Sequence, residues 1–95
     1  MFVVTLKFSD NKTEAGAHMA GHKDWIQQGF AKGLFLMVGS LQPNQGGGIL
    51  AHNTSREDLE AFVQEDPFVS ENVVTAEVME ITPARVDNRL EFLAA

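Results

Sequence analysis

The centre of the chain, residues 34–52, has the sequence LFLMVGSLQPNQGGGILAH. The unbroken apolar run 34–38 is short enough for a strand and is apolar on both faces, so both of its faces are expected to be covered. Residues 48–52 form a second strand candidate. The segment between them contains Pro43, Asn44 and three consecutive glycines, which are typical of a turn. The pattern predicts a β-hairpin in the middle of the chain.

An amphipathic helix is predicted before this hairpin, from about residue 13 to residue 32. At about 100° per residue, its apolar positions fall within one narrow stripe. The stripe comprises Ala15, Met19, His22, Ile26, Phe30 and Gly33. Lys23 and Asp24 lie on the solvent side, while Trp25 and Gly29 lie on the flank. Gly33 is a natural stop at the C-terminal end.

A second, shorter helix is predicted after the hairpin. Thr54 and Glu57 have the spacing of a capping box, in which the hydroxyl accepts a backbone N–H at the helix start. The helix is expected to run to about Glu65, with an apolar stripe made of Leu59, Phe62 and Val63. Asp66 is the next position on that stripe. Because Pro67 disfavours helical geometry in the residue before it, the Asp66 carboxylate is expected at or just past the helix end.

Strand patterns lie at both ends of this arrangement. Residues 2–8, FVVTLKF, alternate with a period of two, and residues 73–81 form a β-branched strand that Pro83 ends. The order strand, helix, strand, strand, helix, strand predicts an α+β fold of the ferredoxin-like β-α-β-β-α-β type. Its four antiparallel strands would carry both helices on one face.

The opposite face of that sheet is predicted to be too apolar for water. Its outward positions are Val3, Thr5, Val73, Met79 and Ile81. Burial against the sheet of a second copy would cover them, so a homodimer of the dimeric α/β barrel type is expected. The length of 95 residues allows one domain with a thin margin of stability, which association would increase.

Composition narrows the partners and the compartment. Thirteen acidic against seven basic residues give a net charge of −6, and residues 57–80 hold eight carboxylates and no Lys or Arg, which disfavours nucleic acid. The chain has no cysteine, which excludes disulfides and thiol chemistry and fits the cytoplasm. The N-terminus has the pattern of a strand rather than of a signal peptide, and no apolar run approaches the roughly 18 residues of a membrane span.

His22 is the best-placed candidate for chemistry. It lies on the apolar stripe of the first helix, where an imidazole without a partner loses hydrogen bonds to water at a cost of about 1–3 kcal/mol. Asp66 is the best available partner, since both helices cover the same sheet face. A carboxylate on one ring nitrogen fixes the tautomer and leaves the other nitrogen basic for proton abstraction. The alternative is a buried hydrogen bond with a purely structural role.

Two further residues are predicted to line a cleft beside His22. Ser40 follows Gly39 at the end of an apolar strand, and nothing in the sequence places a base beside it to make it a nucleophile. His18 precedes His22 by one turn, a spacing that can hold a metal, but no acidic residue nearby completes a chelating set. We therefore expect no metal and no organic cofactor.

The chain resembles the YCII-related (YciI-like) family over about residues 1–83. The resemblance is carried by His22, Gly33, Gly39, a glycine-containing hairpin and the triplet 66–68, Asp-Pro-Phe. It implies a ferredoxin-like domain that dimerises through its sheet, with a His–Asp pair in a cleft at His22 and Asp66. Ser40 departs from the pattern, because the family often has proline there.

The C-terminal tail, residues 84–95, lies outside this resemblance. Val86, Leu90 and Leu93 have helical spacing in it, so a short helix that docks on the partner subunit is expected; fraying is the alternative.

The resemblance to the YCII-related family implies lyase-like elimination or isomerisation of a small acid. Together with the candidate pair, it favours a small dimeric enzyme of lyase or isomerase type. His22, oriented by Asp66, would act as general base on a small organic acid or lactone, with Ser40 and His18 lining the cleft. The alternative is a non-catalytic module that binds a small metabolite or regulates a partner through the same cleft.

Overall fold

One antiparallel sheet of four strands organises the computed structural model, which describes residues 1–94. The strands are β1 (Phe2–Phe8), β2 (Phe35–Leu41), β3 (Gly46–Ala51) and β4 (Val74–Glu80). Their order across the sheet is β2-β3-β1-β4, and every neighbouring pair is antiparallel. The first and last strands of the sequence are therefore adjacent, with β1 in the interior of the sheet.

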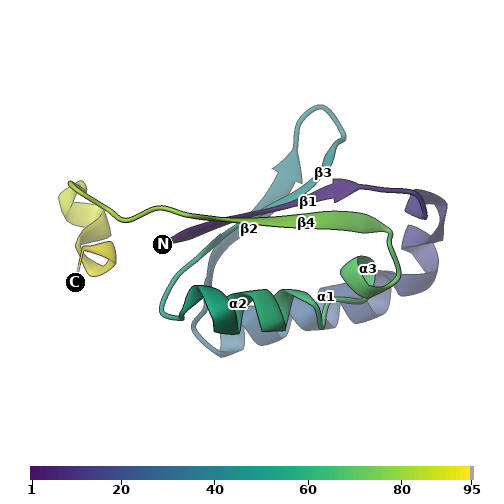
Figure 1. Ribbon diagram of the computed structural model, residues 1–95, viewed down its shortest axis with the longest axis horizontal. Coiled ribbons are helices and arrows are strands. Elements are labelled where there is room, and N and C mark those ends of the chain that lie inside the picture. Colours follow the sequence, from purple (N-terminus) through teal and green to yellow (C-terminus); the bar gives the residue numbers. More distant parts are fainter. Residues whose placement is uncertain (95) are drawn as a thin grey trace.

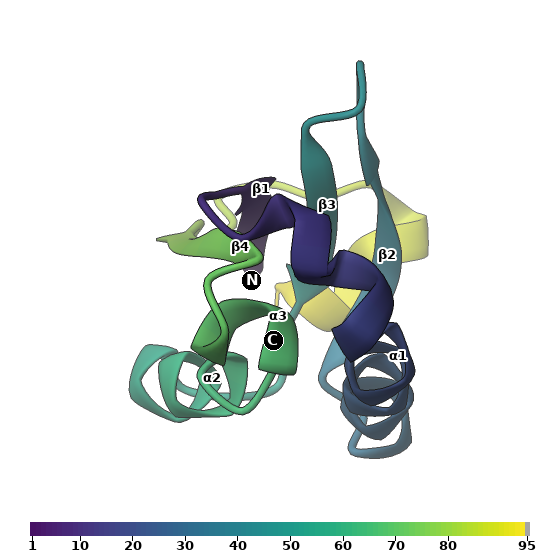
Figure 2. The same cartoon turned by 90° about the vertical axis from the view of Figure 1, so that its right-hand side faces the viewer.

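All three α-helices lie on one side of this sheet (Figures 1 and 2). They are α1 (Ala15–Ala31), α2 (Arg56–Val63) and the single-turn α3 (Pro67–Ser70); a 3-10 turn, Lys12–Glu14, precedes α1. The topology confirms the predicted ferredoxin-like α+β fold, with α3 as an addition. None of the helices within residues 1–94 has the length and apolar character to cross a membrane.

The core fills the space between the sheet and the helices. Trp25 is central to it: its indole Nε1–H donates a 2.9 Å hydrogen bond to the carbonyl of Phe62, and its ring stacks on Phe62 and meets the edge of Phe35. The buried apolar residues are Phe2, Val4, Leu6, Trp25, Phe35, Ile49, Ala51, Leu59, Phe62, Val63, Phe68, Val73 and Val74.

The buried face of α1 differs from the predicted stripe. Trp25 and Gly29, expected on the flank, are its buried residues, whereas Met19 and Phe30 are 38% and 45% exposed. The helix turns its largest aromatic residue inward because that ring buries the most apolar surface and finds a carbonyl for its N–H. Gly29 leaves room for the Phe35 ring, since a Cβ there would lie 2.2 Å from two of its carbons.

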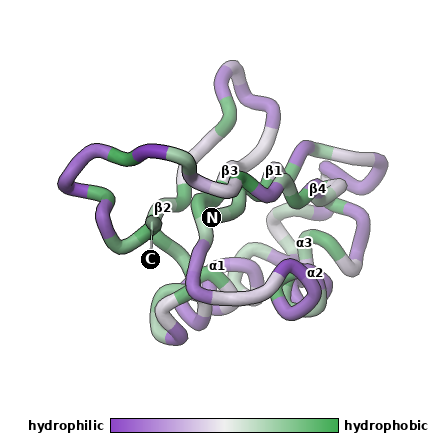
Figure 3. The backbone as a smooth tube through the Cα atoms, turned by 60° about the vertical axis from the view of Figure 1, so that its left-hand side comes forward, coloured by the Kyte–Doolittle hydropathy of each residue, from purple (hydrophilic) through white to green (hydrophobic). Residues whose placement is uncertain are grey.

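The hairpin also differs from the prediction. The three glycines 46–48 belong to β3 and pair with residues 41, 40 and 39 of β2, so both strands extend beyond the predicted ranges. The turn is formed by residues 42–45, with a cis Gln42–Pro43 bond and Asn44 at φ 47°. Gly46 has φ 131°, and a Cβ on it would collide with the Leu6 carbonyl, so a glycine is required there for close backbone approach. The hydrophilic tip projects beyond the sheet (Figure 3).

The cap of α2 is Ser55 rather than Thr54. The Ser55 hydroxyl accepts a 3.1 Å hydrogen bond from the Asp58 backbone N–H, while the Thr54 hydroxyl faces only the Ser55 carbonyl at 3.4 Å. The predicted capping box was therefore one residue too early, because serine and threonine in adjacent positions leave the choice to the local backbone.

We expect Ser55→Ala to lower the free energy of unfolding by about 1 kcal/mol, since it removes the acceptor for an N–H at the start of α2. Thr54→Ala, the matched control, is expected to change it by less than about 0.5 kcal/mol. Urea denaturation of both variants measures the difference. Equal losses in the two variants would contradict the assignment of the cap.

Within residues 1–94, no helix lies over the outer face of the sheet (Figure 1). One cross-strand row on it is apolar throughout and consists of Met37, Leu50, Val3 and Met79. Met37 and Met79 are 53% and 44% exposed in the single chain, so the expected covering of this face requires a second molecule. Val73, predicted on this face, is instead fully buried in the core, because β4 begins one residue later.

The tail leaves the sheet after β4 and ends in a 3-10 helix, Asn88–Leu93, beyond the edge of the domain (Figure 1). The Phe92 and His52 rings meet edge to face, with their centroids 5.5 Å apart. Leu90 and Phe92 remain 43% and 50% exposed. Hydrogen bonds from the Arg89 side chain and backbone N–H hold the pKa of the Asp87 carboxyl below its usual value. This short helix has a kink at Leu90, its docking on a partner subunit stays a prediction, and Ala95 lies outside the described residues.

Candidate active site

Asp66 lies in the connection between α2 and α3. Its backbone is extended (φ −68°, ψ 120°), as expected for a residue before proline, and it is the N-cap of α3. The carboxylate oxygen Oδ1 accepts a 3.0 Å hydrogen bond from the Phe68 backbone N–H. The predicted position just past the end of α2 is therefore confirmed.

The predicted contact between His22 and Asp66 is present. Nδ1 of His22 lies 2.9 Å from Oδ1 of Asp66, across 44 residues of sequence. An ionised carboxylate only accepts hydrogen bonds, so opposite it Nδ1 carries the hydrogen, and a neutral imidazole then has its lone pair on Nε2. This arrangement fixes the tautomer and the orientation of the imidazole.

Burial and aromatic packing restrict the pair further. Asp66 is fully buried, and the His22 side chain is 14% exposed. The His22 ring stacks face to face on Phe68, with centroids 3.9 Å apart and an interplanar angle of 3°, and Trp25 lies 6.1 Å away on the core side. Within residues 1–94, the second carboxylate oxygen, Oδ2, is buried without a hydrogen-bond partner. The imidazole is thus held by one strong acceptor and one aromatic ring.

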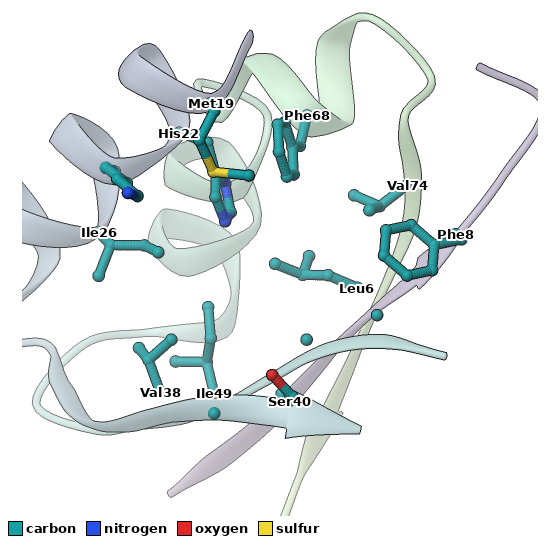
Figure 4. A pocket seen from close by; sticks show the side chains of 15 residues that line it. Leu6, Phe8, Met19, His22, Ile26, Val38, Ser40, Ile49, Phe68 and Val74 are labelled. Atoms are coloured by element: carbon teal, nitrogen blue, oxygen red, sulfur yellow. The ribbon is translucent and has the colours of Figure 1, made fainter. Parts of the chain in front are cut away.

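A cavity of about 320 Å³ opens beside His22, between α1, α3 and the inner face of the sheet (Figure 4). Most of its lining is apolar and comes from Leu6, Phe8, Met19, Ile26, Val38, Ile49, Phe68 and Val74. In Figure 4, His22 and Ser40 lie on opposite sides of the cavity, and the Ser40 oxygen points into it. Such a volume is at the small end of ligand sites and is suited to one small molecule.

Among residues 1–94, three polar side chains line this cavity, namely those of His22, Lys23 and Ser40. Ser40 is a lining residue, as predicted, because it lies in the same cross-strand row as Gly47 and Leu6 on the inner face. Lys23 and the glycines of β3 also line the cavity and were missed from the sequence. The helical wheel placed Lys23 on the solvent side, and the glycines had the pattern of a turn.

His18 does not line this cavity, although it lies one turn before His22. His18 is seven residues, or about two turns, before Trp25, so it lies on the same side of α1 as Trp25. Residues 1–94 contain no group of three or more His, Cys, Asp or Glu side chains arranged to hold a metal ion.

Comparison with solved structures gives a similar fold. The 5-chloro-2-hydroxyhydroquinone dehydrochlorinase (TftG) of Burkholderia phenoliruptrix AC1100, in complex with 2,5-dihydroxybenzoquinone, superposes with a TM-score of 0.67. The match covers 85% of this chain and 93% of the dehydrochlorinase at 14% sequence identity, so the likeness is one of fold. A search of curated proteins finds no significant match. The model of the YCII-related domain matches residues 1–84, and the chain therefore belongs to the YCII-related family.

Proposed function

We propose that the protein is a small lyase- or isomerase-type enzyme in which His22, oriented by Asp66, is the general base. Its substrate is a small organic acid or lactone that enters the apolar cavity. One observation carries the proposal: the Asp66 bond to Nδ1 leaves the basic Nε2 of a cavity-lining imidazole free for a substrate proton. In the structural alternative, the Asp66 carboxylate only caps α3 and anchors the His22 ring. That role requires no cavity beside the ring.

The proposed reaction begins with transfer of a proton from a carbon next to a carbonyl or carboxyl group to His22 Nε2. The C–H electron pair then either expels a leaving group from the adjacent carbon, forming a C=C bond, or moves into the carbonyl as an enolate. In the second case a C=C bond conjugated with the enolate allows the imidazolium to return the proton to the far carbon of that bond, so that the double bond shifts. The Asp66 carboxylate stabilises the imidazolium, so the pair acts without a metal or an organic cofactor.

The dehydrochlorinase of similar fold supports the choice of substrate class, because its structure holds a small ring compound, 2,5-dihydroxybenzoquinone. A single ring of this size also suits a cavity of about 320 Å³. The apolar lining is suited to excluding water from an enolate or an eliminating substrate, which keeps the base unsolvated and the intermediate protected.

The experiment that tests the function is a screen in D₂O. The protein is incubated with γ-lactones, hydroxylated cyclic acids and 2,5-dihydroxybenzoquinone, and NMR follows deuterium incorporation and product formation. Thermal denaturation in the same mixtures reports binding. Exchange or product formation above the buffer rate supports the enzyme. Stabilisation without any turnover would instead favour a metabolite-binding module, and neither effect across the panel would contradict both.

We further propose that the protein is a homodimer that buries the outer sheet face. The exposed row Met37, Leu50, Val3 and Met79 is the main support, since it forms an apolar strip across all four strands with no helix over it. The adjacent row starts with Gly39 and Gly48, which have no side chains, and continues through Thr5 to Glu77. An open apolar strip on one face is suited to a two-fold partner of the same kind.

Light scattering at micromolar concentration is expected to give twice the mass of one chain for the wild type. Met37→Glu combined with Met79→Glu should give a monomer, because four carboxylates would otherwise be buried in the interface. Met19→Glu, on the helical side of the molecule and 38% exposed, is the matched control and should remain dimeric. A monomeric wild type would overturn the proposal.

A further inference from the structure

The charge of the cavity lining differs in sign from that of the whole chain. The protein has 13 acidic and seven basic residues, yet no carboxylate lines the cavity. In the part of the chain that the structure describes, the one permanently charged side chain in this lining is Lys23, which belongs to the same turn of α1 as His22. A cation at the edge of an apolar cavity attracts an anion and repels a second cation.

Lys23 is also free to bind a ligand. Two other lysines form cation–π contacts. The Nζ atom of Lys12 lies 4.7 Å from the centroid of the Phe8 ring, and that of Lys32 lies 4.6 Å from the centroid of the Phe62 ring. Lys23 forms neither an ion pair nor such a contact with any of residues 1–94. Its sequence neighbour Asp24 accepts a hydrogen bond from the Gln28 amide instead. The Lys23 ammonium therefore has no internal partner to give up when a ligand anion arrives.

The sheet side of the cavity is flat where Gly47 lies. Gly47 is in the inner cross-strand row between Ser40 and Leu6, both of which line the cavity. A Cβ on Gly47 would have one neighbour within 4 Å, the Gly39 carbonyl oxygen at 3.5 Å. Because glycine has no side chain, the space at this position is left open. That space lies on the sheet side of the cavity, while the stacked rings of His22 and Phe68 lie on its helical side.

We infer that the cavity binds a small planar ring compound carrying one anionic oxygen group, with the anion held by Lys23 and the ring lying over Gly47. The inference rests on the proposed function for the role of His22 and names the substrate class of the same site. Lys23 is then a specificity-determining residue: it selects acids over neutral analogues and holds the ring so that a carbon next to the anionic group faces Nε2. Gly47, which has no side chain, leaves the space that the ring occupies.

The first test measures binding of two unreactive compounds with the same ring, benzoate and benzamide. Trp25, the single tryptophan, lies 6.1 Å from His22 and reports their binding by fluorescence. The wild type is expected to bind benzoate about three- to tenfold more tightly than benzamide, and less so at 1 M salt. Lys23→Met should abolish that preference, and Lys23→Glu should reverse it, while benzamide affinity stays unchanged. Lys32→Met, which removes a lysine held over Phe62, is the matched control.

The second test fills the cavity. Gly47→Val is expected to weaken benzoate and benzamide equally, by more than tenfold, and to leave the melting temperature unchanged, because valine suits a strand. Equal affinity of the wild type for both compounds, no binding of either, or the same loss in Lys32→Met as in Lys23→Met would overturn the role of Lys23. Unchanged affinity in Gly47→Val would overturn the role of Gly47. Neither test depends on turnover, so the substrate class and the proposed reaction can fail separately.

Discussion

Replacing His22 with asparagine is expected to lower the rate of proton abstraction by about 10²- to 10⁴-fold, the usual contribution of a positioned general base. An asparagine amide nitrogen can take the place of Nδ1 and donate to Asp66 Oδ1, but it offers no base where Nε2 lies. The variant should therefore retain the buried hydrogen bond and lose the chemistry. Deuterium exchange into the substrate found in the D₂O screen measures the rate.

His52→Asn is the matched control for this experiment. His52 contacts Phe92 of the tail and does not line the cavity, so its replacement should leave the rate within twofold of the wild type. Thermal denaturation of both variants separates a catalytic from a structural role. A His22→Asn protein that is several kcal/mol less stable but still exchanges at the wild-type rate would show that the pair serves only the fold.

Gly29→Ala is expected to produce the largest loss of stability of any single methyl group added to α1. The new Cβ would lie 2.2 Å from two carbons of the Phe35 ring, well inside contact distance. Overpacking of this kind costs about 3 kcal/mol, which exceeds the roughly 1 kcal/mol that alanine gains over glycine in a helix. The net loss of about 2 kcal/mol should lower the melting temperature of a 95-residue domain by about 8–16 °C.

The same change at Gly16 provides the control. No atom lies within 4 Å of a Cβ built there, so Gly16→Ala should raise stability by up to about 1 kcal/mol. The double variant Gly29→Ala with Phe35→Leu removes the ring that is overpacked and should recover part of the loss, which a double-mutant cycle measures. A Gly29→Ala protein as stable as the wild type would mean that α1 can shift away from β2 without cost.

The fold was predictable because its elements follow one another in a pattern that few topologies satisfy. The alternation in residues 2–8, the helical period after it and the central hairpin together specify the order of elements. The rotation of α1 was predicted wrongly, since a hydrophobic wheel weighs Met19 and Phe30 like any other apolar residue. It cannot represent the carbonyl that Phe62 offers to Trp25 or the ring that fits over Gly29.

The candidate site was predictable only in part. His22 and Asp66 were found because a buried polar residue on an apolar stripe needs a partner, and each helix offered one. Lys23 could not be found in this way, because its exposed position on the helix is compatible with any solvated lysine. The role of Gly47 depends on strand register: as part of a turn it would carry no information about the cavity, and only the pairing with Ser40 and Leu6 places it on the inner face.

A single atom, Oδ1 of Asp66, serves two purposes: it holds the His22 ring and it caps α3 through the Phe68 N–H. Under the proposed function, selection for activity and selection for folding therefore act on the same residue. His22, in contrast, is required for the reaction and not as the cap of α3. A descendant of this protein that lost its substrate would be free to replace His22 while still requiring Asp66. Natural variants with the aspartate but without the histidine would then mark lineages in which the fold is retained and the activity is lost.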